Sequence, residues 1–135
     1  MSSDQQPLFQ TVPLPEQRDV YAPDGSEIRL LSQTERGSMC HCTLPPQTVS
    51  LAGMHHNVEE IWYFLEGQGQ VWRKGEQGEE VVAVFPGVSL SIPPHTHFQF
   101  RNASSEPLRL ILTTMPPWPG ENEWVEVTPH WPVEQ

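Results

Sequence analysis

Basic residues are scarce in this chain of 135 residues: 7 Lys and Arg stand against 17 Asp and Glu, giving a formal net charge of −10. Such a chain repels the phosphates of nucleic acids and of anionic membranes. It also has no run of roughly 18 apolar residues that could span a bilayer, and its first ten residues lack a secretion signal. We therefore expect a cytoplasmic protein with no nucleic-acid and no membrane partner.

Cysteine is nearly absent, with only Cys40 and Cys42, one residue apart. On a strand two such thiols point the same way, and no second pair completes a zinc site. His41 between them would point to the opposite face. We interpret this segment as a buried strand in a reducing compartment.

Long helices are excluded by the 15 Pro and 9 Gly, which interrupt the chain every few residues. Between these breaks, short runs of alternating or β-branched apolar residues predict about nine strands. The predicted strands are 28–31, 39–44, 48–52, 61–65, 70–73, 81–85, 88–92, 97–100 and 108–114. This regular spacing of strands and turns favours an all-β sandwich or barrel in one domain.

The two ends of the chain differ from the middle in composition. We expect an N-terminal arm over 1–20, a barrel over 21–114, and a Pro- and Trp-rich C-terminal segment over 115–135. Neither end has the pattern of a barrel strand. We interpret the three tryptophans of the C-terminal segment as covering barrel edges or a subunit contact, rather than as contacting a ligand.

Four of the six histidines fall in two clusters about 40 residues apart. The first segment, Gly53 to Gly67, contains His55, His56 and Glu60 and reads GMHHNVEEIWYFLEG. The second, Phe85 to Asn102, contains His95 and His97 and reads FPGVSLSIPPHTHFQFRN. Imidazole and carboxylate groups are ligands that divalent transition metals favour.

These two segments resemble the two signature motifs of the cupin superfamily in order, spacing and the glycine that ends the first motif. The resemblance implies a double-stranded β-helix, or jelly-roll, barrel that binds a small molecule and forms a homodimer. It also implies a divalent metal, usually held by two His and one Glu from the first motif and one His from the second.

The first motif fits this pattern only in part. Glu60 matches, with six residues between it and Gly67, and alternation places Trp62 and Phe64 on its face, toward the barrel interior. The His-x-His pair is incomplete. One spacing selects His56 with Met54 in the other ligand position, and a spacing one residue longer selects His55 with Gly53.

The second motif leaves a similar choice. One alignment puts Phe98 at the ligand position, whereas the His-Phe-Gln run puts His97 there, which pairs with the spacing that selects His55. We prefer His55, Glu60 and His97 as metal ligands, with His56 and His95 as alternates. The metal would be one divalent ion of Fe, Mn, Ni, Cu or Zn.

Alternation also predicts two faces on the second histidine strand. His95, His97, Gln99 and Arg101 share one face, and Thr96, Phe98 and Phe100 share the other. We place the polar face around the site. The predicted pocket residues are Trp62, Phe64, Phe98 and Gln99.

Three functions compete on this basis. The first is a metal-dependent enzyme, a dioxygenase or an isomerase or lyase, acting on a small polar molecule. The second is a metal-free barrel that binds a small molecule or sugar, or a metal-independent epimerase that uses His56 and Glu60. The third is a partner-binding barrel in which the Trp-rich segment carries the interface.

Overall fold

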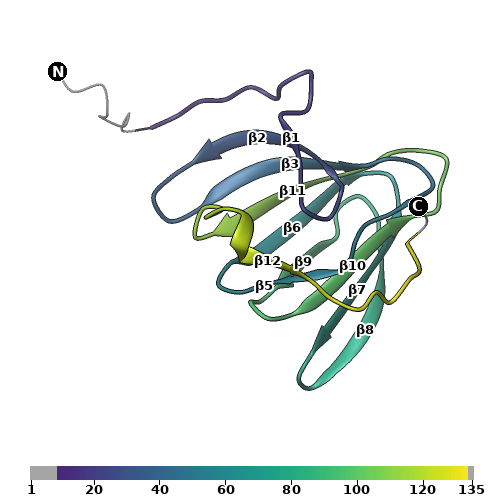
Figure 1. Cartoon of the computed structure of the whole chain (residues 1–135). Helices are drawn as coiled ribbons and strands as arrows, with labels where there is room; N and C mark the ends of the chain where they lie inside the picture. Colours follow the sequence, from purple (N-terminus) through teal and green to yellow (C-terminus); the bar gives the residue numbers. More distant parts are fainter. Residues whose placement is uncertain (1–8, 134–135) are drawn as a thin grey trace.

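The chain folds into strands joined by tight turns, as seen in a computed structural model (Figure 1). The structure describes residues 9–133, so residues 1–8 of the predicted arm and 134–135 of the C-terminal segment lie outside the described residues. Within 9–133 the only helix is one 3-10 turn, η1 (Glu121–Glu123). The predicted all-β jelly-roll class is confirmed.

Two antiparallel sheets face each other, and the chain crosses repeatedly between them. The first sheet has the order β1-β2-β3-β11-β6-β9. Its strands are β1 (Val20–Tyr21), β2 (Glu27–Gln33), β3 (Ser38–Leu44), β11 (Leu108–Met115), β6 (Glu59–Glu66) and β9 (Ser89–Ile92).

The second sheet has the order β12-β5-β10-β7-β8, with β4 also paired to β10. Its strands are β12 (Trp124–Glu126), β5 (Gly53–His55), β10 (His97–Asn102), β7 (Gly69–Gly75), β8 (Gly78–Val84) and β4 (Thr48–Val49). Figure 1 shows β5 and β10 across the interior from β3, β11 and β6.

Side-chain alternation explains how these strands enclose a core. Buried and partly exposed residues alternate over the whole of β11, and Glu60, Trp62 and Phe64 form the buried face of β6. The main core cluster joins Trp62 and Phe64 to Phe98 and Phe100 of β10. The prediction that Glu60, Trp62 and Phe64 share an inward face is therefore confirmed.

Gly67 makes the crossing from β6 to β7 possible, because these consecutive strands belong to different sheets. Its φ is +82°, and a Cβ atom there would overlap the carbonyl oxygen of Pro107. Only glycine combines this backbone conformation with such a close approach. The fold therefore requires glycine at position 67, where the first motif ends.

The strand prediction succeeds in the middle of the chain and is incomplete elsewhere. The predicted strand over 48–52 is shortened to Thr48–Val49, while the two- and three-residue strands β1, β5 and β12 were not predicted. The prediction that the C-terminal segment contains no barrel strand is wrong, because β12 pairs with β5. Strands this short depend on a partner more than on their own pattern.

No helix within residues 9–133 is long and apolar enough to cross a membrane.

Candidate active site in the barrel pocket

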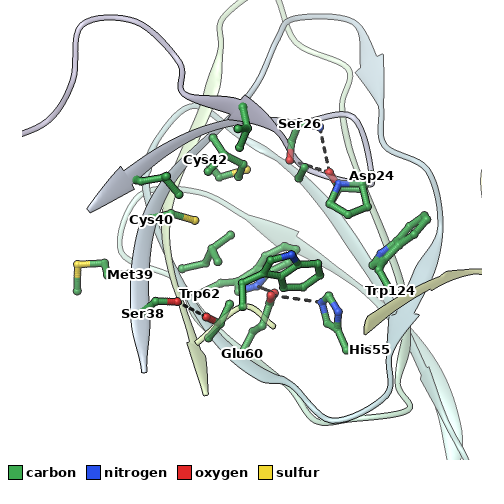
Figure 2. A pocket seen from close by; sticks show the side chains of 18 of the residues that line it. Asp24, Ser26, Ser38, Met39, Cys40, Cys42, His55, Glu60, Trp62 and Trp124 are labelled. Carbon is green, nitrogen blue, oxygen red and sulfur yellow. Dashed lines mark hydrogen bonds and ion pairs between the residues drawn. The ribbon is translucent and has the colours of Figure 1, made fainter. Parts of the chain in front are cut away.

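A pocket of about 370 Å³ opens between the two sheets. Its walls come from β1, β2 and β3 on one side and from β5, β6, β10 and β11 on the others, with two tryptophans of the C-terminal segment. Most of its lining is apolar. Polar side chains form three hydrogen-bonded or ion-paired groups in this lining. Figure 2 shows two of them on opposite sides of the pocket, His55 with Glu60 and Asp24 with Ser26. The third is the pair of hydroxyl groups of Ser38 and Thr114, which are hydrogen-bonded to each other.

His55 and Glu60 form the first polar group. His55 ends β5 and Glu60 lies near the start of β6, and only 4% and 6% of their surfaces are exposed. His55 Nε2 lies 3.3 Å from Glu60 Oε2. The other carboxylate oxygen, Oε1, accepts a hydrogen bond of 2.8 Å from Trp62 Nε1. The indole therefore fixes the carboxylate while leaving Oε2 turned toward the imidazole.

The imidazole of His55 has unused hydrogen-bonding capacity. Neither ring nitrogen has a hydrogen-bond partner, because the 3.3 Å approach to Glu60 is within ion-pair range but is not aligned as a hydrogen bond. The ring lies between Phe98 and Trp118, with centroids 5.3 Å away in each case. A buried polar group without a partner is costly, so a bound molecule would gain by supplying one.

Backbone contacts hold His55 and the turn that follows it. The carbonyl of His55 accepts a hydrogen bond of 2.8 Å from the amide of His95, and the amide of His56 donates to the carbonyl of Glu123. The Glu123 carboxylate accepts hydrogen bonds from the amides of Asn57 and Val58, at 2.6 and 2.9 Å. The turn between β5 and β6 is therefore clamped by the C-terminal segment.

The charge of Glu123 suits this clamp. Burial by itself raises the pKa of Glu123, but the hydrogen bonds from Val58 and Asn57 outweigh burial and hold the pKa below its ordinary 4.5. The carboxylate stays ionised over the neutral range and keeps its two amide partners.

Asp24 and Ser26 form the second polar group, in the turn between β1 and β2. Asp24 Oδ1 accepts hydrogen bonds from the amide and the hydroxyl of Ser26, at 3.0 and 2.7 Å. Burial raises the pKa of Asp24, although the two hydrogen bonds act in the opposite direction. This carboxyl thus tends toward its neutral form.

Cys40 and Cys42 also face the pocket from β3. Burial raises the pKa of Cys40 to about 12 and that of Cys42 well above its ordinary value. Both thiols remain protonated at neutral pH and form part of the apolar wall. The interpretation of this segment as a strand with both thiols on one face is confirmed by β3.

The second motif presents the opposite face of its strand to the pocket from the face that our preferred alignment predicts. Phe98 and Phe100 line the pocket, whereas His97 is partly exposed and is not among the lining residues. The structure therefore does not bring His97 to His55 and Glu60, and Phe98 stands there instead. The physical reason is that burying two phenyl rings favours this face of β10 over the polar one.

Gln99 also lies on the outer face of β10, so it is not a pocket residue. Its amide group donates to the carbonyls of Ser50 and Trp131, and its oxygen accepts from the amides of His130 and Trp131. Gln99 is fully buried because the C-terminal segment covers it. The polar face of β10 thus anchors this segment.

The remaining predicted residues are distributed as follows. Trp62 lines the pocket, while Phe64 lies behind it in the core. The alternates His56 and His95 are exposed and lie outside the lining. Of the predicted pocket residues, Trp62 and Phe98 alone line it.

Sequence reasoning missed Trp118 and Trp124, which line the pocket rather than only covering an edge. Trp124 packs on Gly53, where a Cβ atom would overlap the indole. The third tryptophan, Trp131, fits the prediction that these residues cover the barrel. It packs with Ala52 and Trp72 outside the main core. No local pattern indicates that the chain returns to β5 at Trp124.

The residues present do not fit the metal that the resemblance implies. Within residues 9–133 no three or more His, Cys, Asp or Glu side chains are grouped closely enough to hold a metal ion. His55 and Glu60 supply two donors, and Phe98 supplies none. Protein sites for divalent transition metals generally use three or four side-chain ligands.

Comparison with known proteins agrees with this architecture. Residues 40–114 match the cupin domain family. The chain is 31% identical over 104 residues to the uncharacterised protein MJ1618 of Methanocaldococcus jannaschii, covering 73% of this chain and 80% of that protein.

Two further proteins are similar to this chain over only a part of their own length. The mannose-1-phosphate guanylyltransferase RfbM of Salmonella typhimurium is 31% identical over 85 residues, covering 63% of this chain but 17% of that protein. A variant of oxalate decarboxylase from B. subtilis superposes with a TM-score of 0.73 at 15% identity, over 92% of this chain and 34% of that one. With the family match over most of the barrel, the chain belongs to the cupin family.

Proposed function

We propose that this cupin is an enzyme that transfers a proton on a small molecule bound in the pocket, using His55 and Glu60 without a metal. The observation that carries the proposal is the buried imidazole of His55, whose two ring nitrogens lack partners beside a carboxylate. Such pairs of titratable groups in a largely apolar cavity are typical of acid–base sites.

The two groups have complementary environments. Glu60 Oε1 is held by Trp62, so Oε2 is the oxygen free to accept a proton from a bound molecule. Imidazole can both donate and accept protons near neutral pH, and His55 lies within 3.3 Å of that oxygen. A molecule seated against both could lose a proton to one group and regain it from the other at a neighbouring atom.

This exchange of protons corresponds to isomerisation next to a carbonyl group, and return of the proton to the opposite face of the same carbon corresponds to epimerisation. Trp62, Phe98 and Trp118 line the pocket beside the pair, and apolar walls of this kind strengthen the electrostatic effect of the two groups. The similarity to oxalate decarboxylase supports only that this fold can carry an enzyme site. The homodimer and the cytoplasmic location stay predictions.

Hydrogen–deuterium exchange tests the proposal directly. Small α-hydroxy ketones and α-amino ketones in D₂O are followed by proton NMR, with and without the metal-depleted protein. The native protein is expected to accelerate exchange of the α-proton. Removing either partner, by His55→Gln or Glu60→Gln, should slow the catalysed exchange about 100-fold or more, the usual contribution of an acid–base group.

His56→Gln is the matched control, since this neighbouring histidine is exposed and outside the pocket. It should exchange at the native rate. Exchange that continues unchanged in both His55→Gln and Glu60→Gln contradicts the assigned roles. Activity that disappears with a chelator and returns only with an added metal contradicts the metal-free mechanism.

A further inference from the structure

The pocket contains carboxyl groups but no basic counterpart. Asp24 and Glu60 both face it, and neither lysine nor arginine is among its lining residues. His55 is the single histidine in that lining. An anionic group entering the pocket would therefore leave water without meeting a permanent positive charge.

The seven basic side chains of the chain are placed elsewhere. Arg73 and Arg109 pair with Glu80 and Glu66. Arg29 bonds the carbonyls of Pro15 and Glu16, and Arg101 bonds Gln70 and lies over Trp131. Arg36 and Lys74 are exposed.

Arg18 contacts one residue of the pocket lining, Tyr21. Its guanidinium lies over the ring of Tyr21, 4.3 Å from the centroid. Tyr21 is 57% exposed, so this contact belongs to the open side of the pocket. Arg18 itself is not a lining residue.

Aromatic rings lie around the side of the pocket that holds His55 and Glu60. Phe98 and Trp118 flank the His55 ring, and the Trp62 ring lies 5.8 Å from that of Phe98. Aromatic faces carry partial negative charge and attract cations, most strongly in a cavity with little water. Carboxylate and aromatic groups together favour a positively charged ligand.

We infer that the pocket takes an organic amine with an apolar body, its ammonium group directed to Glu60, and selects against carboxylates and phosphates. The inference rests on the proposed function, since it names the class of molecule that would occupy the same site. Four features of such a ligand are matched, and three of them are its size by the cavity, its apolar body by the walls, and its charge by Glu60. The fourth, a hydrogen bond to His55, is met by an ammonium N–H.

The experiment compares three molecules that share a ring and differ in one group. Dissociation constants of benzylamine, benzyl alcohol and benzoate are measured near neutral pH by ligand-observed NMR. Benzylamine is expected to bind at least about tenfold more tightly than benzoate, with benzyl alcohol between them. Glu60→Gln should weaken benzylamine about tenfold and change benzyl alcohol by less than about threefold.

Glu59→Gln serves as the control, because it makes the same charge change at the adjacent exposed residue of β6. It should leave all three constants unchanged. Benzoate binding as tightly as benzylamine, or a benzylamine preference that Glu60→Gln leaves intact, overturns this inference while the pocket still binds small molecules. Binding of none of the three also overturns this inference, whereas the proton-exchange assay on small ketones decides the proposed function separately.

Discussion

Strands β6 and β10 both carry residues that sequence motifs single out, yet they place those residues in opposite ways. On β6 the polar Glu60 shares its face with Trp62 and Phe64, and that face is buried. On β10 the aromatic residues and the histidine lie on different faces, and the aromatic face points inward. Alternation defines two faces of a strand, and burial of aromatic area decides which one is inside.

The largest effect that tests this comparison is truncation of the inward ring of β10. Phe98 is 2% exposed and contacts the rings of His55 and Trp62. Phe98→Ala should lower the free energy of unfolding by about 3–5 kcal/mol, as for other buried phenylalanines. Urea denaturation of this variant and of His97→Ala gives the comparison.

His97→Ala should cost no more than about 0.5 kcal/mol, because the side chain is partly exposed and outside the core. Equal losses in the two variants, or a larger loss for His97→Ala, would contradict the inward orientation of Phe98.

The next effect concerns the outer face of β10. Gln99→Leu keeps a side chain of similar size but removes the amide group, which makes four hydrogen bonds to backbone groups. Leaving such groups unpaired should cost about 2–3 kcal/mol and loosen the C-terminal segment. Proteolysis within residues 127–133 should therefore accelerate in this variant. Unchanged proteolysis and stability would contradict the anchoring role.

A smaller, pH-dependent effect concerns the turn that leads into β6. Because the folded-state pKa of Glu123 lies below its ordinary 4.5, its contribution is present above that pH and is lost as the pH falls through the folded pKa. Glu123→Gln should destabilise the protein by about 1–2 kcal/mol at pH 7. Thermal unfolding of both proteins should converge toward acidic pH. A difference that is constant from pH 7 to pH 3 would contradict the charged clamp.

The parts of this molecule that could be predicted from sequence are those set by local pattern. The spacing of Glu60 and Gly67 identified the first motif, and the alternation along β6 identified the buried face of that strand. The orientation of β10 could not be settled in the same way, because His97 and Phe98 each satisfy one version of the motif. Burial of the aromatic rings decides the orientation, and the C-terminal segment, more than 30 residues away, supports it by covering Gln99 on the outer face.

The same limit applies to the pocket walls. Asp24 lies in a Pro-Asp-Gly sequence that is typical of a turn, but its burial follows from the strands packed around it. Trp124 reaches the pocket because β12 pairs with β5 over three residues. Contacts of this kind are set by tertiary packing, which a short strand pattern does not encode.

Metal stoichiometry shows whether Phe98 faces His55 and Glu60 and leaves them with too few ligands for a metal. Co(II) binding is measured by equilibrium dialysis for the native protein, His97→Ala and Phe98→His. The native protein and His97→Ala should each retain less than about a tenth of an equivalent, whereas Phe98→His, which supplies a third donor, should gain affinity for the ion. Stoichiometric binding by the native protein that is lost in His97→Ala would mean that His97, and not Phe98, faces His55 and Glu60.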